Sequence, residues 1–257
     1  KGKIKGRYTI LGRNPDYIWE FNRDICKQIK NNKTKILKSS PKKIVDHIIE
    51  NFKFKMPKDL PNISSIISGY FSYDIIRYIE KIPNQCKDDL RIPDIRLIRP
   101  KSLIILDNIE KKIFFIRNFF KEEKVKNYFN AYNNVKADIE NLILLANCDN
   151  YFERNNKTIK SKVSSNISKK KYLNNVIKAQ KYIKKGDIFQ VVLSQRFETK
   201  LSKKPLDIYK KLRITNPSPF MFYFNFSDFQ IIGASPEILV RLRDGNITIR
   251  PIAGTRP

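Results

Sequence analysis

Histidine and cysteine are nearly absent from this sequence, which contains one histidine and three cysteines in 257 residues. The cysteines stand far apart and form none of the close pairs that zinc or redox motifs need, so we expect Cys26, Cys86 and Cys148 to be reduced thiols. Because His47 is alone, the chain has no histidine-rich metal site or histidine-based triad of its own. His47 borders the apolar stripe of a helical pattern, which favours a structural role.

Long hydrophobic runs are also missing. No segment approaches the roughly 18 to 20 uncharged apolar residues that a membrane span needs, and no signal-peptide pattern stands at the start. We therefore expect a soluble, cytoplasmic protein without a membrane partner. The sequence starts at Lys1 rather than at methionine, and we expect it to be part of a longer chain.

Acidic residues are scarce, at 25 against 52 lysines and arginines, which leaves a net charge of +27. Such a charge attracts phosphates over long range and invites a nucleic-acid interpretation. The lysines, however, are spread along the whole chain among many asparagines and isoleucines, as an adenine- and thymine-rich genome would produce. We favour this compositional explanation and expect no nucleic-acid partner. Binding measured across salt concentrations would separate the two, because phosphate-driven affinity falls steeply as salt rises.

The 41% apolar content is enough for a sizeable core in one or two domains. The first part, residues 1–150, reads as mixed strand and helix. We expect strands at 6–12, 101–108 and 111–119 and a helix at 41–54. Residues 122–146 should form a second helix with one buried side, made by Val125, Phe129, Tyr132, Val135, Ile139, Leu142 and Leu145. Residues 149–168 are polar and aperiodic, which predicts a domain boundary.

The second part, residues 165–257, has clear element boundaries. Ser168 can cap a helix that Gly186 ends in a left-handed conformation. Pro205 opens a further helix, and the Asn216-Pro217 pair closes it. Two hairpins are expected to follow. Ser227-Asp228 and Asp244-Gly245 would make their turns. The predicted fold class is α+β, with two domains of helices packed on largely antiparallel sheets.

Residues 187–197, "DIFQVVLSQRF", alternate in the manner of a strand. Phe189, Val191, Leu193 and Phe197 would share one face, and Gln190, Ser194 and Arg196 the other. The polar face could meet a ligand or simply solvent, and spacing alone leaves both possibilities open.

Several segments together resemble the chorismate-utilising enzyme family and, within it, the large component of anthranilate synthases. The strongest are "GDIFQVVLSQRF", "NPSPFMFYF", "GASPEILVR" and "IRPIAGTRP". "GRYTILGRNPD" and "GYFSYDIIRYIEKIP" match more loosely. The order and spacing of these motifs carry the resemblance, since a single Gly-Thr turn would mean little.

The resemblance implies a reaction in which ammonia adds at C2 of chorismate, the C4 hydroxyl leaves and pyruvate is eliminated. Hydroxide is a poor leaving group, so a carboxylic acid beside the C4 oxygen would lower the barrier. By resemblance Glu237 takes this role. Gly254 and Thr255 correspond to positions that contact chorismate, where glycine permits close backbone approach and threonine can donate to a carboxylate. An ordinary surface glutamate and an ordinary turn are the alternatives.

Two positions discriminate among relatives. Aminodeoxychorismate synthases commonly carry a nucleophilic lysine where this chain has Ala253, and isochorismate and salicylate synthases carry a water-activating lysine at the substrate-site position of Gln190. Neither chemistry is possible with alanine or glutamine. The resemblance therefore favours direct attack by ammonia, with an aminodeoxychorismate synthase-type aminase as the alternative.

Pro219, Phe220 and Met221 correspond to the segment that binds tryptophan, the feedback inhibitor of the family. The family more often has tyrosine at the position of Phe220, so one hydroxyl is lost. The rest of the inhibitor site includes a segment that would precede Lys1.

The family also implies a catalytic histidine, acidic Mg²⁺ ligands and a glutamine amidotransferase subunit that supplies ammonia. None of these has a counterpart in this sequence, and we expect the Mg²⁺ ligands in a C-terminal part beyond Pro257. The 257 residues alone are therefore expected to be inactive. A non-catalytic, tryptophan-binding role is a further alternative.

Overall fold

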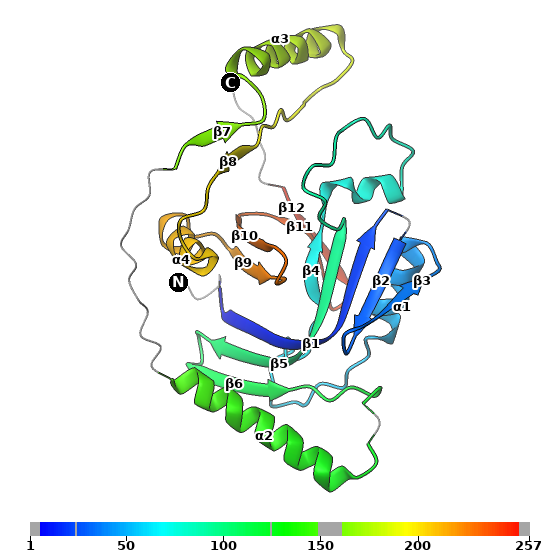
Figure 1. Ribbon diagram of the computed structural model, residues 1–257, viewed down its shortest axis with the longest axis vertical. Helices are drawn as coiled ribbons and strands as arrows, with labels where there is room; N and C mark the ends of the chain where they lie inside the picture. Colours follow the sequence, from blue (N-terminus) through cyan, green and yellow to red (C-terminus); the bar gives the residue numbers. More distant parts are fainter. Residues whose placement is uncertain (1–5, 24, 124, 149–160, 252–257) are drawn as a thin grey trace. The chain divides into compact units, whose positions relative to one another are not determined.

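The computed structural model describes residues 6–23, 25–123, 125–148 and 161–251 (Figure 1). The chain divides into two compact units, Lys1–Asn150 and Tyr151–Pro257. The division falls in the polar segment where the sequence pattern places a boundary.

A six-stranded antiparallel sheet forms the centre of the first unit (Figure 1). Its main path has the order β3-β2-β1-β5-β4, and β6 pairs with the second half of β5. The predicted strands near the start and at 101–119 are confirmed. The strands are β1 (Tyr8–Asn22), β2 (Ile25–Lys30), β3 (Lys33–Leu37), β4 (Ser68–Phe71), β5 (Ile95–Asp107) and β6 (Lys112–Arg117).

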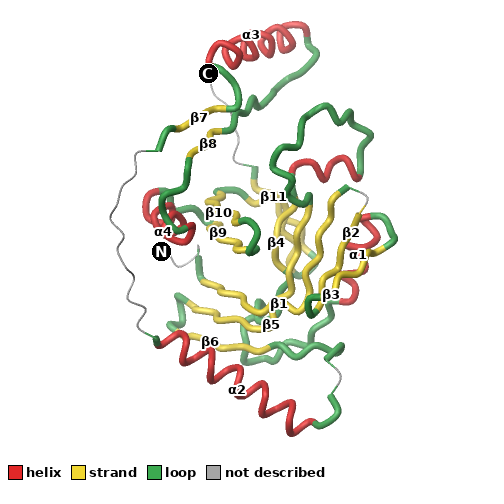
Figure 2. Tube along the Cα trace, viewed as in Figure 1, coloured by secondary structure: helices red, strands yellow, loops and turns green. Residues whose placement is uncertain are grey.

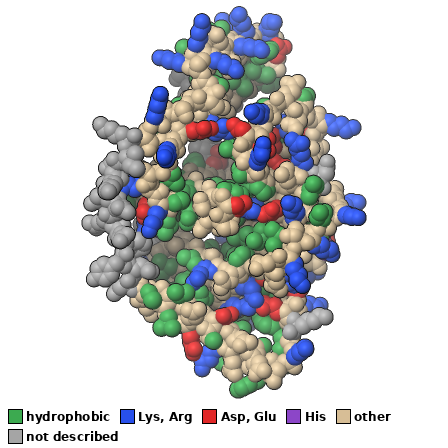
Figure 3. Space-filling view, viewed as in Figure 1, with side chains coloured by type: hydrophobic (Ala, Val, Ile, Leu, Met, Phe, Trp, Pro, Cys, Tyr) green, Lys and Arg blue, Asp and Glu red, His purple; other side chains and the backbone are tan. Residues whose placement is uncertain are grey.

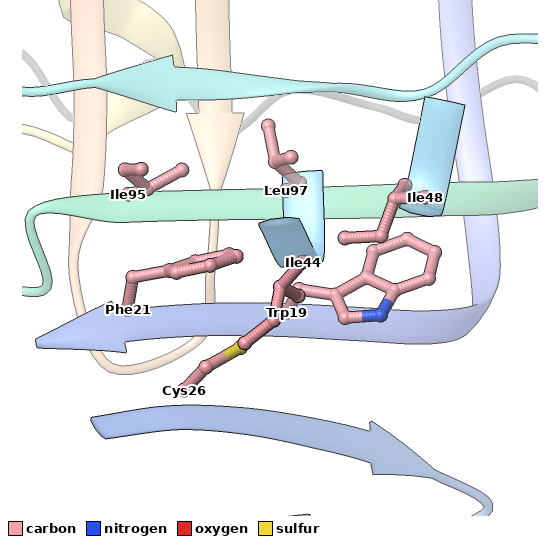
Figure 4. Packing of buried hydrophobic residues seen from close by; sticks show 7 residues of the cluster. All are labelled: Trp19, Phe21, Cys26, Ile44, Ile48, Ile95 and Leu97. Carbon is pink, nitrogen blue, oxygen red and sulfur yellow. The ribbon is translucent and has the colours of Figure 1, made fainter. Parts of the chain in front are cut away.

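One long strand, β5, carries both cores of this sheet. Its first half contributes Ile95 and Leu97 to one cluster, and its second half contributes Leu103 and Ile105 to another. The first cluster is closed by α1 (Pro41–Asn51), whose buried Ile44 and Ile48 face the sheet. Figure 4 shows how it is assembled from α1 and three strands; its members are Trp19, Phe21, Cys26, Ile44, Ile48, Ile95 and Leu97. Burial raises the pKa of the Cys26 thiol to about 12, so this thiol is inert.

Both helices of the first unit begin at side-chain caps. Ser40 accepts the Lys43 N–H at the start of α1, with Pro41 as the first helical residue. Asn127 caps α2 (Tyr128–Asn147). The predicted helix is confirmed, but its predicted buried side is only partly right. Leu142 is buried, whereas Phe129, Tyr132 and Leu145 are exposed.

The length of α2 explains this exposure. Twenty helical residues extend for about 30 Å, while the six residues of β6 cover only about 20 Å. The ends of the helix therefore overhang the strand on which it packs. Between α1 and α2 the chain also forms the short 3-10 helix η1 (Tyr73–Tyr78).

The described part of the second unit, residues 161–251, contains two helices and three separate two-stranded antiparallel sheets. Its α3 begins at the Ser168 cap and ends at Gly186, whose φ of 78° is left-handed, as predicted. The Pro205 start of α4 and both hairpins are confirmed as well. The elements are β7 (Val163–Ser165), α3 (Lys169–Lys185), β8 (Phe197–Thr199), α4 (Pro205–Thr215), β9 (Phe220–Asn225), β10 (Gln230–Ser235), β11 (Ile238–Arg243) and β12 (Asn246–Arg250).

The predicted strand at 187–197 is wrong for most of its length. Only Phe197 belongs to a strand, the three-residue β8 that pairs with β7, and Figure 2 draws the chain between α3 and β8 as loop. The predicted packing face is exposed, with Phe189 at 99%. A strand requires a neighbour for its backbone hydrogen bonds, and no described strand pairs with 188–195. The alternating pattern remains, but the pairing is absent. The fold class itself, mixed helix and antiparallel sheet, is confirmed.

Candidate functional site

The β9–β10 hairpin is built around a row of aromatic rings. Phe222, Phe224 and Phe226 follow one another along one side, with ring centroids 5.7 and 5.5 Å apart. On the other side, Tyr209 of α4 stacks on Tyr223 at 6.0 Å. The alternation of the sequence thus produces two aromatic faces, and α4 covers one of them.

Gly233 is the residue that lets this hairpin close. It lies opposite Phe222 in the pairing of β10 with β9. A Cβ at position 233 would lie 2.1 Å from Cζ of the Phe222 ring. The aromatic ring thus occupies the space of the missing side chain, which fixes the register of the hairpin.

The predicted tryptophan-binding segment lies at the start of this hairpin. Pro219 precedes β9, and Phe220 and Met221 are its first two residues. The Ser218 N–H donates to Sδ of Met221 at 3.4 Å. Phe220 is paired with Ser235 and therefore lies beside the segment that leads to Glu237.

Glu237 occupies the short connection between β10 and β11. It is exposed, and its backbone carbonyl accepts a hydrogen bond from Oγ of Ser235 at 3.3 Å. Pro236 fixes one backbone angle directly before it. The connection is thereby restrained on one side by the hairpin and on the other by β11.

The second hairpin, β11–β12, returns the chain to the neighbourhood of Glu237. Asp244 and Gly245 form its turn with φ angles of 51° and 76°, the left-handed pair that this kind of turn needs. Its register pairs Ile238 with Arg250, so that the end of β12 lies beside the residue that follows Glu237. The strand pairings of two consecutive hairpins, β9–β10 and β11–β12, therefore place residues 220 and 250 beside the two ends of the connection that carries Glu237.

The other predicted substrate residues are not joined to this group. Gln190 is exposed in the loop after α3, and no described sheet connects that loop to β9–β12. Gly254 and Thr255, with Ala253, lie outside the described residues. The structure therefore brings Glu237 near the predicted inhibitor segment but leaves the positions of the substrate residues untested.

In the first unit the sequence reasoning missed a buried ionic cluster. Asp16 is the extra residue of a β-bulge at Pro15, and the bulge directs its carboxylate at the guanidinium of Arg99, with oxygen–nitrogen distances of 2.9 and 2.6 Å. Glu122 is the second acidic partner, at 3.2 Å. Burial opposes the charge of Arg99, yet these hydrogen bonds outweigh it and raise the pKa of Arg99 above its usual value.

This cluster is a structural clamp. The guanidinium of Arg99 also lies 3.7 Å from the ring centroid of Phe120, which adds a cation–π contact to its two ion pairs. Pro15, which interrupts the strand pattern, was the sequence signal for a bulge. Only the fold shows that the bulged residue Asp16 pairs with Arg99. His47 is exposed and contacts the Asn51 amide at 3.0 Å, in agreement with a structural role.

Within the described ranges, no group of three or more histidine, cysteine, aspartate or glutamate side chains could hold a metal ion. No helix of the described chain combines the length and hydropathy needed to cross a membrane. In Figure 3 the lysines and arginines are scattered over the visible face among polar and apolar side chains, a distribution that fits the compositional explanation of the charge.

Comparison with known families decides what these hairpins belong to. The family model described as chorismate binding enzyme matches residues 13–257. The chain belongs to the chorismate-binding enzyme family. The match runs through both compact units, as do the sequence motifs that carry the resemblance.

Several curated relatives of this chorismate-binding chain are named anthranilate synthase component 1, and the resemblance to anthranilate synthase large components is confirmed. "Anthranilate synthase component 1" of Acetivibrio thermocellus is 37% identical over 99% of this chain and 53% of its own length. That of Cereibacter sphaeroides is also 37% identical, over 99% of this chain and 52% of its own. The chain thus spans about half the length of these relatives.

A solved structure agrees with this family assignment. Anthranilate synthase component I from Streptococcus pneumoniae superimposes with a TM-score of 0.81 at 27% identity. The match covers 96% of the chorismate-binding chain and 56% of the pneumococcal one. The fold of the described elements is accordingly that of an anthranilate synthase large component.

Proposed function

We propose that this chain is part of an anthranilate synthase large component, which converts chorismate and ammonia to anthranilate, pyruvate and water in tryptophan biosynthesis. The observation that carries the proposal is the 37% identity over 99% of the chain to proteins named anthranilate synthase component 1. Their names concern proteins about twice as long. The activity is therefore proposed for the complete protein and not for these 257 residues.

The proposed chemistry gives Glu237 the role of general acid. Ammonia forms a bond to C2 of chorismate while the C4–oxygen bond breaks, and a proton from the Glu237 carboxyl leaves with that oxygen as water. Loss of the C2 proton and of the enolpyruvyl group as pyruvate then gives the aromatic amine. A general acid of this kind contributes about 10²- to 10⁴-fold to a rate. The restrained connection between β10 and β11 supports this role.

Ammonia is the proposed nucleophile because the chain lacks the alternatives. Gln190 has no basic amine to activate water, and Ala253 cannot attack the ring. Gln190, Gly254 and Thr255 are proposed to contact chorismate. Tryptophan is proposed to bind at Pro219, Phe220 and Met221, whose place beside the Glu237 segment would let an inhibitor act on the general acid.

Two further components are proposed for the complete protein. The described residues do not fit a magnesium site, so we propose that the ligands of Mg²⁺ lie outside this chain. A glutamine amidotransferase subunit is the proposed source of ammonia, which is consistent with relatives named component 1. The proposed location of the complex is the cytoplasm.

The test uses the complete gene product that contains this chain, assayed with chorismate, ammonium and Mg²⁺ by anthranilate fluorescence. We expect anthranilate as the product and a fall in kcat of about 100-fold or more for Glu237→Gln. The matched control is Glu198→Gln, an exposed glutamate of β8, which should keep the full rate. Formation of isochorismate or aminodeoxychorismate, or a full rate for Glu237→Gln, would overturn the proposal.

The isolated 257-residue chain makes a second comparison. We expect no anthranilate from it under the same conditions. Calorimetry with tryptophan on the complete gene product separates the alternatives, because tryptophan binding without turnover by that protein would favour a purely regulatory role.

A further inference from the structure

A cleft of about 560 Å³ lies in the first unit, between the edge strand β3 and the first half of α1 (Figure 1). Its volume falls within the range of roughly 300 to 1,000 Å³ that is usual for small-molecule sites. Three lysines line it, namely Lys35, Lys38 and Lys43, together with His47. Among the described residues, no acidic side chain lines the cleft. Two elements therefore bring positive charge to the same space.

The three lysines of this cleft have no partner of their own. Within the described part of the chain, their ammonium groups form neither an ion pair nor a hydrogen bond. Lys42, on the same helix, is paired with Asp46 at 3.2 Å. Because no carboxylate competes for the ammonium groups in the cleft, their charge is available to an anionic ligand.

The start of α1 adds to the positive potential of the cleft. The N-terminal end of a helix attracts anions, and the first turn of α1 contains no acidic residue to balance it. At physiological salt, exposed charges further apart than about 8 Å act almost independently. Lysines that line one cleft can contact the same small ligand and so act together, which lysines scattered over a surface cannot do.

Apolar side chains line the rest of the cleft. Ile36 of β3 is 59% exposed, Leu37 is half-buried, and Ile44 is buried as part of the core cluster behind α1. A flat apolar group bound beside Ile36 would remove that side chain from water. Inorganic phosphate offers no such group. The lining therefore fits a ligand that combines several negative charges with a ring.

We propose that this cleft is a binding site for a nucleoside phosphate. The phosphate groups contact the ammonium groups of Lys35, Lys38 and Lys43, and the base covers Ile36. None of these residues belongs to the catalytic or inhibitor set proposed above. The inference does not require the proposed reaction to be correct.

The experiment titrates the complete gene product that contains this chain with ATP, by calorimetry in magnesium-free buffer at physiological ionic strength. We expect binding with a Kd below about 1 mM. Inorganic triphosphate carries the charge without the ring and should bind about threefold more weakly, because it leaves Ile36 exposed. Adenosine carries the ring without the charge and should show no binding.

A triple variant locates the site. Lys35→Gln, Lys38→Gln and Lys43→Gln together should weaken ATP binding by about tenfold, since each exposed charge pair contributes a fraction of this. Ile36→Ser should weaken binding of ATP and leave binding of triphosphate unchanged. The urea midpoint of Trp19 fluorescence verifies that each variant is folded, because Trp19 lies in the core that α1 closes.

The matched control removes the same number of charges elsewhere in the first unit. It replaces three exposed lysines by glutamine: Lys81, Lys87 and Lys136. The affinity for ATP should not change. An equal loss in this control would show general attraction by the net charge of +27 and would overturn the proposal.

Three other outcomes also overturn it. ATP could fail to bind to the folded protein. Triphosphate could bind as tightly as ATP, which would show a bare lysine surface without a place for the base. Tryptophan or chorismate could displace ATP, which would assign the binding to the inhibitor or substrate site. A failure to make anthranilate bears only on the proposed function.

Discussion

The two units of this chain differ in how they bury apolar side chains. In the first unit, one strand, β5, joins two closed cores, and Phe21, Leu103 and Ile105 are fully buried. In the second unit the aromatic row on β9 is the main packed feature, and Phe226 is its one buried hydrophobic among the described residues. Residues 13–257 match one family, yet among the described residues only the first unit contains clusters of buried hydrophobic side chains. Family similarity and self-sufficient folding are therefore separate properties.

The largest expected effect on stability comes from removing the buried ring of Phe21. Phe21→Ala should lower the free energy of unfolding of the first unit by about 3 to 5 kcal/mol, because it leaves a cavity in a closed core. Urea titration followed by Trp19 fluorescence measures this effect, since Trp19 is the only tryptophan and lies in the same core.

The paired control in the second unit is Leu242→Ala. Leu242 is 69% exposed, so the change should stay within about 0.5 kcal/mol. A loss of similar size at both positions would show that the second unit has a core of its own and would remove the contrast.

A smaller effect is expected from the buried clamp. Asp16→Ala should cost about 3 kcal/mol, because it leaves the buried guanidinium of Arg99 without its bidentate partner. In the second unit the pair of Arg196 with Glu198 is exposed, and Glu198→Ala should cost about 0.5 kcal/mol or less. Chemical denaturation of both variants checks this difference, and equal losses would contradict it.

The smallest expected effect is a dependence on pH. A hydrogen bond from Arg7 lowers the pKa of Asp107 to about 2. Burial opposes ionisation of Glu123, but hydrogen bonds from Arg117 and Lys101 outweigh it and bring its pKa to about 2 as well. Both groups ionise more easily when folded. Their contribution is therefore complete above about pH 5 and is lost as the pH falls toward 2.

The measurement is the urea midpoint of the Trp19 transition at a series of pH values. Asp107→Asn should flatten the acid side of this curve relative to the unchanged protein. A midpoint that falls equally steeply in the variant would show that Asp107 does not carry the dependence.

Local signals in the sequence predicted the local structure well. The Ser168 cap, the Gly186 end and the Asp244-Gly245 turn depend on neighbouring residues only, and each is confirmed. The same holds for the alternating phenylalanines of β9, whose rings stack as the spacing predicts.

The misses involve partners distant in the sequence. Alternation at 187–197 predicted a strand with one packed face, but a strand also needs a neighbour, and none of the described strands pairs with 188–195. The buried ion pair of Asp16 could not be predicted from the sequence, because its partner Arg99 lies 83 residues away. For the candidate site, motif resemblance identified Glu237, and only the hairpin register revealed that the inhibitor segment lies beside its connection.

The pairing of β1 with β5 limits how early the central sheet can form while the chain is being synthesised. Phe21 pairs with Ile95 and Tyr8 with Asp107, so one edge of β1 has no partner until synthesis has passed Asp107. At ordinary elongation rates this takes about 5 to 15 seconds after β1 is made, while β2 can protect only the other edge. During this interval Trp19 and Phe21 are open to chaperones and to aggregation. The nascent chain is therefore most prone to aggregation before β5 has been synthesised.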